Sequence, residues 1–412
     1  MRKYKITAPS KSLDHAISIS GSKSISNRVL IIRALAGSTL DIHNLSNSED
    51  SFLLIDALNN SDRDLHDLNH AGTSFRFLCA YYAIQRGSQI LTGSARMQQR
   101  PIAPLVEALN EIGANIEYLE EEGYPPVKIH AFQSQDKKRV SIKADVSSQF
   151  ISALCLIAPY LPEGLEIDLE EEIVSSSYIN MTLGLMEEFG IQLSQDDRKI
   201  LIPNQTYSFK EFTVESDWSS AAYLMAICSM IPGSQLALQS FFQDSLQGDS
   251  EILNLFRDFG LESEFENGIL RVQLTGSQTD SFSYDFINIP DQFQSFCVLA
   301  AAKKMNFKAK GLSTLAHKES DRVNAMHAEL EKIGLGLETS SDNHHEVELK
   351  GQCIIDEPEF DTHHDHRMAL SLSIFSTLGP IIIKEPQVIE KSFPDYWNIL
   401  TELGFQIQKI PT

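Results

Sequence analysis

The sequence has little cysteine and no long apolar run. Its five cysteines, spread over 412 residues, form no Cys-x-x-Cys pair, which argues against a disulfide framework and a cysteine metal site. Isolated thiols in apolar segments are typical of a reducing compartment, so we expect a cytoplasmic protein. No apolar run reaches the roughly 18 residues that a membrane-spanning helix needs. The first 20 residues also lack the apolar core of a secretory signal. We therefore expect no membrane partner.

Positive charge is also scarce. Lys and Arg number 34 against 56 Asp and Glu, which gives a formal net charge of −22. Nucleic-acid-binding proteins usually carry a basic surplus or stripe, so we expect no nucleic-acid partner. An acidic total still permits an anionic ligand, because a binding site responds to the local charge. Such a site must gather its Lys and Arg side chains inside one cleft.

Several nucleotide-binding and catalytic motifs are missing. The sequence holds no GxxxxGK[ST], GxGxxG, GxSxG or HExxH, which argues against P-loop, dinucleotide-binding and nucleophile-elbow classes. The run from His363 to His366 contains residue types that bind metals. Adjacent side chains of a helix do not readily converge on one ion, so we expect no metal at this run.

Two helical patterns recur with a period of about 73 residues. The first is an amphipathic helix closed by a glycine, which suits a left-handed C-terminal position. Its glycines, spaced 77, 70, 74 and 70 residues apart, are Gly113, Gly190, Gly260, Gly334 and Gly404. The second is a more apolar helix that ends in a turn before a short strand. Its turns are expected at Gly37, Gly87, Gly164, Gly233, Asn306 and Gly379.

The repeated patterns predict an α/β fold. Ordinary alternating α/β architecture is the alternative, but a period kept in two independent patterns favours six copies of one repeat. The apolar helices are hydrophobic nearly all round, so they should be buried. Six repeats exceed the usual size of one core, which favours two domains of three repeats. The first interval is about 23 residues shorter than the period, and residues 59–69 are polar. We therefore expect a shortened first repeat.

Cationic residues stand at the starts of the apolar helices. Lys23 and Arg28 lie in GSKSISNR, Arg76 in HAGTSFR and Arg367 in HHDHR. A helix N-terminus suits an anion because its N–H groups are unpaired. Ser, Thr and Asp there also serve as ordinary caps, which is the plainer interpretation of any single start. Buried cations are costly unless an anion meets them, so the four together favour an anion site.

Seven motifs then occur in the order found in the 5-enolpyruvylshikimate-3-phosphate synthase family: GSKSISNR, AGTSFR, RMQQRP, VSSQF, KESDR, DHRM and KSFPDY. The sequence resembles that family from about residue 9 to residue 396. The resemblance implies an α/β fold of two globular domains, each of three βαβαββ repeat units with buried helices. Domain 1 would hold residues 1–19 and 214–412, and domain 2, with the shortened repeat, residues 20–213. The active site would lie in the cleft between them.

The resemblance also implies an enzyme, a 3-phosphoshikimate 1-carboxyvinyltransferase. Such an enzyme transfers the carboxyvinyl group of phosphoenolpyruvate to the 5-hydroxyl of shikimate 3-phosphate and releases phosphate. Both substrates carry a phosphate and a carboxylate, which accounts for the cations. Proximity and electrostatic stabilisation do most of this work, so we expect no cofactor and no metal. The expected partners are the two small-molecule substrates alone, and we expect a monomer.

The resemblance assigns site residues by motif position. The shikimate 3-phosphate ligands would be Lys23, Ser24, Arg28, Ser147, Ser148, Gln149, Ser175, Tyr178, Asp291, Thr314 and Lys318. The phosphoenolpyruvate ligands would be Lys23, Gly72, Arg100, Gln149, Arg322, Arg367 and Lys391. The catalytic residues would be Asp291, Glu319, Lys23 and Lys318. Asp291 is our hypothesis for the base at the 5-hydroxyl, and Glu319 for the donor to the methylene carbon.

The sequence departs from the family pattern at a few positions. His70 and Thr314 stand where many members carry Asn, and the first repeat is shortened. Two alternatives remain. A transferase acting on UDP-N-acetylglucosamine shares the chemistry, but that family has a Cys-bearing loop near the position of Arg100, where this sequence has none. The other is a catalytically silent anion-binding scaffold. Gly72 leaves space in the pocket, so we expect glyphosate to compete with phosphoenolpyruvate.

Overall fold

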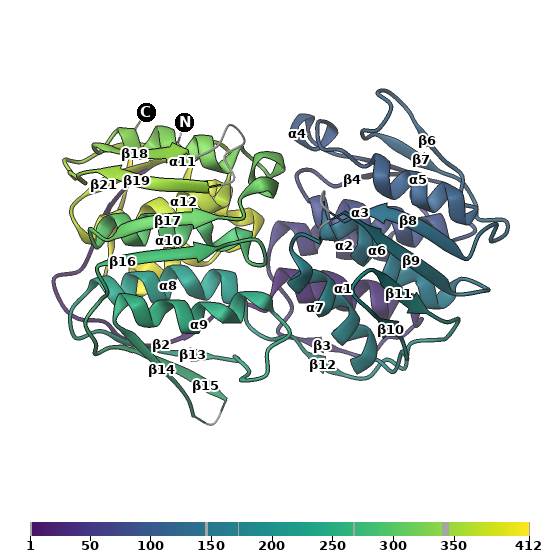
Figure 1. Ribbon diagram of the computed structural model, residues 1–412, viewed down its shortest axis with the longest axis horizontal. Helices are drawn as coiled ribbons and strands as arrows, with labels where there is room; N and C mark the ends of the chain where they lie inside the picture. Colours follow the sequence, from purple (N-terminus) through teal and green to yellow (C-terminus); the bar gives the residue numbers. More distant parts are fainter. Residues whose placement is uncertain (1, 145–146, 172, 267, 340–345, 412) are drawn as a thin grey trace. The chain divides into compact units, whose positions relative to one another are not determined.

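The computed structural model describes residues 2–144, 147–171, 173–266, 268–339 and 346–411. Val146, the first residue of the VSSQF motif, lies outside the described residues. The chain forms two compact units (Figure 1). The discontinuous unit comprises Met1–Ser20 and Glu215–Thr412, and the continuous unit comprises Gly21–Val214. The boundaries expected from the sequence differ from these by one residue.

One βαβαββ repeat of the continuous unit shows the common topology. Two parallel strands flank a buried helix, and an amphipathic helix leads to a hairpin whose second strand pairs antiparallel with the second parallel strand. The elements are β4 (Leu65–Asp67), α3 (Gly72–Ala83), β5 (Gln89–Thr92), α5 (Ala103–Ile112), β6 (Ile116–Tyr118) and β7 (Val127–Ile129). The expected glycine closes α5, because Gly113 takes a φ of 117° that other residues rarely adopt.

Four further sheets have the same strand order. In the continuous unit the elements are β8 (Arg139–Lys143), α6 (Ser148–Ile157), β9 (Leu165–Glu170), α7 (Ser176–Glu188), β10 (Ser194–Gln195) and β11 (Lys199–Ile202). In the discontinuous unit the first repeat has β2 (Asp14–Ser18), α8 (Trp218–Met230), β13 (Gln235–Gln239), α9 (Ile252–Leu255), β14 (Leu261–Glu266) and β15 (Ile269–Leu274). The second has β16 (Ser281–Asp285), α10 (Phe293–Ala302), β17 (Asn306–Lys310), α11 (Arg322–Glu331), β18 (Leu335–Thr339) and β19 (Glu346–Gly351). The third has β20 (Glu359–Phe360), α12 (His366–Leu372), β21 (Ile381–Lys384), α13 (Tyr396–Glu402), β22 (Gln406–Ile410) and β1 (Lys3–Thr7).

The remaining repeat is the first one in the continuous unit, and it is short, which confirms the expectation from the sequence. It contains α1 (Lys23–Leu35), β3 (Ile42–His43), α2 (Glu49–Asn59) and β12 (Phe212–Thr213). Among the described residues, β3 and β12 form a sheet of two strands where the other sheets have four. After α2 the chain enters β4 within a few residues, so the hairpin of the other repeats is missing. The turn expected at Asn306 is wrong by two residues, because Lys304 takes the left-handed conformation and Asn306 begins β17.

The chain passes from one unit to the other twice, after residue 20 and after residue 214. The strand before each of these points pairs with a strand that is distant in the sequence. β2 precedes α1 in the chain but pairs in parallel with β13, which follows α8. β12 precedes α8 but pairs in parallel with β3, which follows α1. β2 thus completes a sheet of the discontinuous unit, and β12 completes a sheet of the continuous unit.

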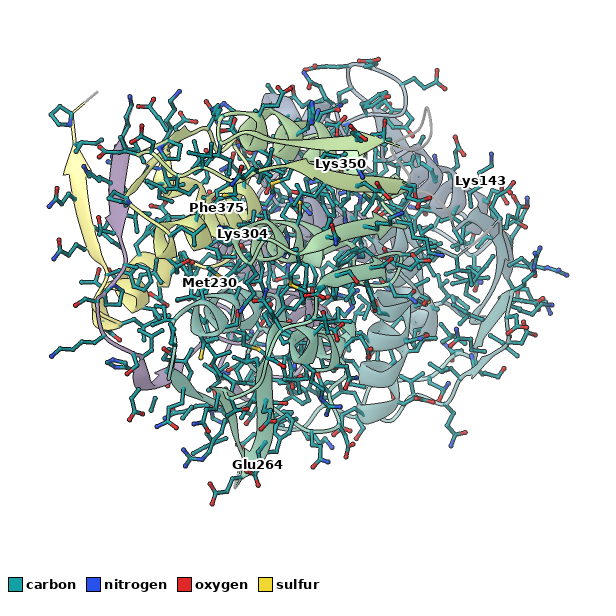
Figure 2. The ribbon with its side chains drawn as sticks, turned by 60° about the vertical axis from the view of Figure 1, so that its left-hand side comes forward. Lys143, Met230, Glu264, Lys304, Lys350 and Phe375 are labelled. Atoms are coloured by element: carbon teal, nitrogen blue, oxygen red, sulfur yellow. The ribbon has the colours of Figure 1, made fainter. Side chains whose placement is uncertain are left out.

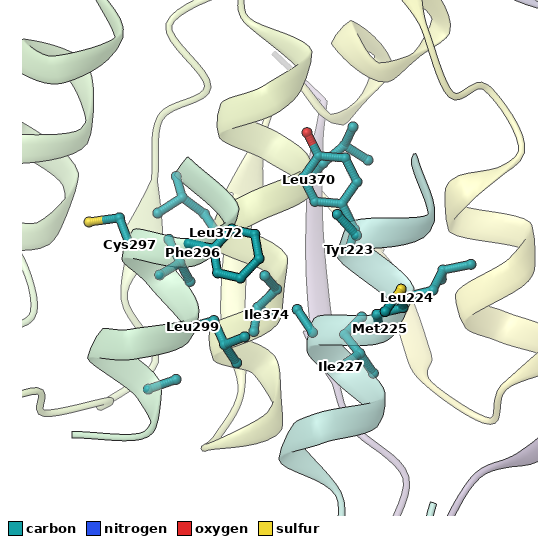
Figure 3. Packing of buried hydrophobic residues seen from close by; sticks show 14 of the residues in the cluster. Tyr223, Leu224, Met225, Ile227, Phe296, Cys297, Leu299, Leu370, Leu372 and Ile374 are labelled. Atoms are coloured by element: carbon teal, nitrogen blue, oxygen red, sulfur yellow. The ribbon is translucent and has the colours of Figure 1, made fainter. Parts of the chain in front are cut away.

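The apolar helices form the two cores. α8, α10 and α12 lie in the core of the discontinuous unit, with Tyr223, Phe296 and Leu372 packed among their side chains (Figure 3). α1, α3 and α6 do the same in the continuous unit. The sheets face outward, so Glu264 on β14 and Lys350 on β19 are exposed while Phe375 is buried (Figure 2). In the part of the chain that the structure describes, no helix combines the length and the apolar character needed to cross a bilayer.

Shortening a buried leucine should test this core. Leu299 on α10 is fully buried, so Leu299→Ala should lower the free energy of unfolding of the discontinuous unit by about 2–5 kcal/mol. Both tryptophans, Trp218 and Trp397, belong to this unit, so urea unfolding followed by tryptophan fluorescence measures it. Leu378→Ala is the control, because Leu378 is 43% exposed and should cost less than about 1 kcal/mol. Equal losses from the two variants would contradict the buried position of α10.

Candidate active site

The starts of three helices bring ionic groups together in the discontinuous unit. Arg322 is the first residue of α11, and Asp321 caps this helix by accepting the N–H of Asn324 at 3.2 Å. Arg367 lies in the first turn of α12, where Asp365 is the cap and accepts the N–H of Arg367 at 2.9 Å. Asp291 lies in the 3-10 helix η4 (Pro290–Gln292), immediately before α10. Local capping therefore fixes the starts of α11 and α12, from which Arg322 and Arg367 extend.

Arg322 is the centre of this cluster. Its guanidinium is almost fully buried and contacts three carboxylates through three different nitrogens. The distances are 2.7 Å from Nη1 to Asp291 Oδ1, 2.8 Å from Nη2 to Glu319 Oε2 and 2.8 Å from Nε to Asp365 Oδ2. A buried cation without such partners would be strongly destabilising, so the three carboxylates and the arginine require one another.

Arg367 and Lys391 extend the network. Arg367 Nη2 lies 2.9 Å from Asp291 Oδ2, and Arg367 Nη1 donates to the hydroxyl of Tyr223 at 3.2 Å. Lys391 ends the 3-10 helix η7 (Pro386–Lys391) and donates to Glu319 Oε1 at 2.6 Å. Four cations, Lys318 included, thus surround the carboxylates of this cluster.

The cations decide the charge state of Asp291. Burial by itself raises the pKa of this carboxyl, but Arg367, Lys318 and Arg322 outweigh burial and hold the pKa well below its usual range. Arg322 responds in the opposite direction. Burial lowers its pKa, but the anions Asp365, Glu319 and Asp291 raise the pKa above its usual value. Asp291 is therefore an anion at neutral pH, and it accepts a proton readily only when its cations are drawn to another anion.

Asp249 is a buried carboxyl beside this cluster that the sequence did not reveal. Its Oδ2 accepts hydrogen bonds from Ser219 Oγ and from Gln292 Nε2. Ser219 Oγ in turn accepts a hydrogen bond from Arg367 Nη2 at 3.4 Å. Burial raises the pKa of Asp249 to about 6, against the lowering effect of the Ser219 hydrogen bond. Asp365 was also missed as a partner, although it lies in the DHRM motif.

The continuous unit gathers a second set of cations at its own helix starts. Lys23, the first residue of α1, lies 3.4 Å from Asp50 Oδ2 on α2. Arg28, one turn further, is buried, and its Nε donates to Thr182 Oγ1 at 2.7 Å. Its Nη2 donates to Ser152 Oγ and to the Tyr178 carbonyl, and its Nη1 to the Ser24 carbonyl at 2.8 Å. Burial lowers the pKa of Arg28 to about 10, which leaves it charged at neutral pH. Arg28 thereby holds the backbone at Ser24 and Tyr178.

Two further arginines face Gly72 at the start of α3. A Cβ at this position would lie 2.5 Å from Arg100 Nη1 and 2.8 Å from Arg76 Nη1, so only glycine lets both guanidinium groups approach. Arg76 Nη1 donates to the Gly72 carbonyl at 2.9 Å, and its guanidinium lies over the ring of Phe150. Gln149 Nε2 on the neighbouring helix α6 donates to Thr73 Oγ1 at 3.1 Å.

The predicted serines lie at the starts of α6 and α7. Ser147 caps α6 by accepting the N–H of Gln149 at 3.3 Å, and Ser148 is buried behind it. Ser175 precedes α7 with a φ of 56°, an uncommon conformation for serine that directs the chain into the helix. Thr314 differs from the rest. It lies in the 3-10 helix η5 (Ser313–His317), and its buried Oγ1 has no hydrogen-bond partner among the described residues.

The histidine run faces separate partners. His363 Nε2 lies 2.8 Å from Glu329 Oε1, His364 Nδ1 lies 3.1 Å from Glu385 Oε2, and Asp365 binds Arg322. Within the described ranges, no group of three or more His, Cys, Asp or Glu side chains is arranged to hold a metal ion. His70, where the sequence departs from the family pattern, contacts Ser94 Oγ at 2.6 Å through Nδ1, and Ser94 caps the short helix α4 (Ala95–Gln98).

The raised pKa of Asp249 predicts a pH-dependent loss of stability. The folded state binds a proton up to about pH 6, whereas an unfolded Asp releases it near pH 4, so stability decreases as the pH rises through this window. Asp249→Asn keeps an oxygen for Ser219 and Gln292 but does not titrate. Relative to the wild type, its free energy of unfolding should increase by about 2 kcal/mol between pH 4 and pH 8.

Tryptophan-monitored urea unfolding at both pH values measures this difference. The exposed Asp280 provides the control, since Asp280→Asn should show the same small difference at both pH values. A pH-independent difference for Asp249→Asn would mean that the carboxyl titrates normally.

Comparison with known proteins identifies the family of the chain. Residues 54–400 match the family model described as EPSP synthase (3-phosphoshikimate 1-carboxyvinyltransferase). A 3-phosphoshikimate 1-carboxyvinyltransferase of Bacteroides fragilis (strain YCH46) is 40% identical over 410 residues, covering 98% of this chain and 99% of the relative. A protein of the same name from Sulfurovum sp. (strain NBC37-1) is 34% identical, covering 96% of this chain and 98% of the relative.

The fold also matches a solved structure. An EPSP synthase from Acinetobacter baumannii superposes with a TM-score of 0.77 at 22% identity, covering 99% of this chain and all of that chain. This likeness confirms the expected α/β fold of βαβαββ repeats. The family model, the near-complete alignments and the ionic clusters at the helix starts lead to one assignment: the chain belongs to the EPSP synthase family.

Proposed function

We propose that the chain is a 3-phosphoshikimate 1-carboxyvinyltransferase, which forms 5-enolpyruvylshikimate 3-phosphate and phosphate in the shikimate pathway. The observation that supports this most is the convergence of Arg322, Arg367 and Lys391 on Asp291 and Glu319. The reaction needs cations for two anionic substrates and carboxyl groups that move protons. This cluster holds both kinds of group within hydrogen-bond distance of one another.

Phosphoenolpyruvate would compete with the carboxylates for these cations. Its phosphate and carboxylate are the groups that guanidinium and ammonium ions bind well. As Arg322 and Arg367 turn towards the substrate, Asp291 loses the partners that lower its pKa. Its pKa then rises, and it becomes a better base for the 5-hydroxyl of shikimate 3-phosphate. We assign Glu319, which shares Arg322 and Lys391 with the substrate, to protonation of the methylene carbon, with Lys318 beside Asp291.

Shikimate 3-phosphate would be bound chiefly by the continuous unit. We assign its phosphate to Ser147, Ser148 and Ser175, at the starts of α6 and α7. Tyr178, Gln149 and Ser24 would hold the ring. The guanidinium of Arg28 makes four hydrogen bonds to described residues, which leaves one of its five N–H groups for the substrate carboxylate. We also assign to this substrate Thr314 of the discontinuous unit, whose hydroxyl is buried.

Lys23, Gly72 and Arg100 complete the proposal. We assign Arg100 to phosphoenolpyruvate, with Gly72 leaving space for the substrate, and Lys23 to both substrates. We further propose a cytoplasmic location, since all five cysteines are unpaired thiols, as in a reducing compartment. The monomer expected from the resemblance also stays a proposal.

A phosphate-release assay tests the activity. Release should require shikimate 3-phosphate and phosphoenolpyruvate together, and should not occur when UDP-N-acetylglucosamine replaces shikimate 3-phosphate. Lys23→Met should lower kcat by about 100-fold or more, because it removes a partly buried cation from the proposed site. The control is Lys210→Met, since Lys210 is 57% exposed and pairs with Glu188 on the surface of the same unit.

The other outcomes decide between the alternatives. Release with the nucleotide sugar alone would assign the chain to the other transferase. Folded protein that releases no phosphate with either pair would identify a silent scaffold. Loss of activity in Lys210→Met as well would show that Lys23 is not specifically required.

A methyl group at Gly72 should weaken phosphoenolpyruvate binding. It would displace the guanidinium of Arg100 or Arg76, so Gly72→Ala should raise KM for phosphoenolpyruvate about tenfold, with a smaller effect on shikimate 3-phosphate. Glyphosate should compete with phosphoenolpyruvate in the wild type and inhibit this variant less. Gly87→Ala is the control, because a Cβ there meets only Gln89 Nε2 at 3.4 Å. Unchanged kinetics in Gly72→Ala would remove Gly72 and Arg100 from the proposed site.

A further inference from the structure

The loop that leads into α12 has two strained residues beside the ionic cluster. His363 and His364 have φ values of 49° and 55°, in the left-handed region that residues other than glycine rarely adopt. Such a conformation costs free energy and persists only where surrounding contacts hold it. The loop ends at Asp365, which binds Arg322 and caps the helix of Arg367. The contacts that hold the loop therefore influence the positions of Arg322 and Arg367.

Glu329 supplies the main contacts. It lies on α11, two turns after Arg322, and is buried although it is a carboxylate. Its Oε1 lies 2.8 Å from His363 Nε2, and its Oε2 accepts the backbone N–H of Asp361 at 2.8 Å. Asp361 Oδ1 in turn accepts the N–H of His363 at 2.8 Å. The side chain of Glu329 thus fastens both ends of the segment that precedes Asp365.

Helix α11 and the loop are joined at two points. Arg322 and Asp365 meet at the start of the helix, and Glu329 and His363 meet two turns later. The backbone joins the two points, because the N–H of Asp365 donates to the Thr362 carbonyl at 2.8 Å. A shift of the loop at His363 would therefore move Asp365 and, with it, the carboxylate that orients Arg322.

The charges around His363 favour its protonated form. The hydrogen bond to Glu329 raises the pKa of His363, and Asp361 adds to this, while burial and Lys332 oppose it. Burial raises the pKa of Glu329, but the hydrogen bonds from His363, Lys332 and Asp361 outweigh it, so the pKa is lowered. Further charged groups on neighbouring elements are Lys384 of β21, near Asp361, and Glu359 of β20, which pairs with Lys384 and with Lys3 of β1. Glu385 pairs with the neighbouring His364.

We propose that Glu329 and His363 are positioning residues, which hold the loop of Asp365 and thereby the Arg322 and Arg367 clamp, and that the hold is strongest when His363 is protonated. The proposal rests on the proposed function for its kinetic consequences. Neither residue touches the reacting groups, so both act on substrate binding through Asp365.

The expected pH dependence has a definite sign. A group whose pKa is raised by a contact strengthens that contact at low pH, and the gain is lost as the pH rises through the raised pKa. Neutral His363 still donates one hydrogen bond to Glu329 in the appropriate tautomer, so the loss is partial. KM for phosphoenolpyruvate should therefore increase about threefold between pH 6 and pH 9 through this pair.

Three variants separate the contributions. His363→Gln keeps a neutral donor and should remove this pH-dependent increase. His363→Leu removes the donor and should raise KM for phosphoenolpyruvate about five- to tenfold at every pH, with kcat within about twofold. His364→Gln is the matched control in the same loop, since His364 is largely exposed and pairs with Glu385, and it should behave as the wild type.

A measurement without turnover keeps this test separate from the proposed function. Hydrogen–deuterium exchange of the segment 359–365 should be faster in His363→Leu than in the wild type, because Glu329, the acceptor of the Asp361 N–H, loses one of the contacts that hold its side chain. NMR titration should place the pKa of His363 above 6.5, and Glu329→Gln should lower it.

The outcomes are distinguishable. If the wild-type protein showed no turnover, the proposed function would be overturned. Hydrogen–deuterium exchange and the NMR titration of His363 would still decide the positioning role. The inference would be overturned if His363→Leu exchanged at the wild-type rate or kept the wild-type KM. It would also be overturned if His363→Gln kept the pH dependence of the wild type.

Discussion

The candidate site of the discontinuous unit depends on the burial of one guanidinium group. Arg322 is excluded from water at the start of α11, and only its three carboxylates make this position tolerable. Those carboxylates come from η4, the segment before α11 and the cap of α12, so a single cation draws three parts of the unit together. The structural requirement and the chemical one coincide in part, because two of the three groups that neutralise Arg322, Asp291 and Glu319, are the carboxyl groups that we assign to proton transfer.

The two units solve the same electrostatic problem in different ways. In the discontinuous unit, cations at helix starts are neutralised by carboxylates. In the continuous unit, Arg28 and Arg76 donate to neutral oxygens and lie over the rings of Phe77 and Phe150. Neutral acceptors and aromatic faces satisfy a guanidinium without cancelling its charge. In the continuous unit the charges of Arg28 and Arg76 are therefore not cancelled by a carboxylate in these contacts, although Lys23 pairs with Asp50.

Much of this architecture could be predicted from the sequence, and the limits have physical causes. Glycines such as Gly113 and Gly260 mark helix ends, because the left-handed conformation is local. The cations at helix starts were also visible. The partners of those cations were not, since contacts such as Asp365 with Arg322 or Asp249 with Ser219 depend on which helix starts meet in space. The resemblance placed residues 1–19 with residues 214–412, but the partners of β2 and β12 were not predicted, because an alternating strand pattern does not specify its neighbour.

The pairing of β1 has a consequence for the order in which the molecule is made. β1 lies between β21 and β22, so a strand at the beginning of the chain fits between two of the last strands to be synthesised. Residues 21–214 can fold while the ribosome is still at work, and β2 can pair once β13 has emerged, but β1 must wait for β21 and β22. Throughout synthesis an unpaired strand therefore stays available to wrong partners. Two charged residues of β1, Lys3 and Lys5, reduce that risk, because charged side chains on a strand discourage pairing with other strands.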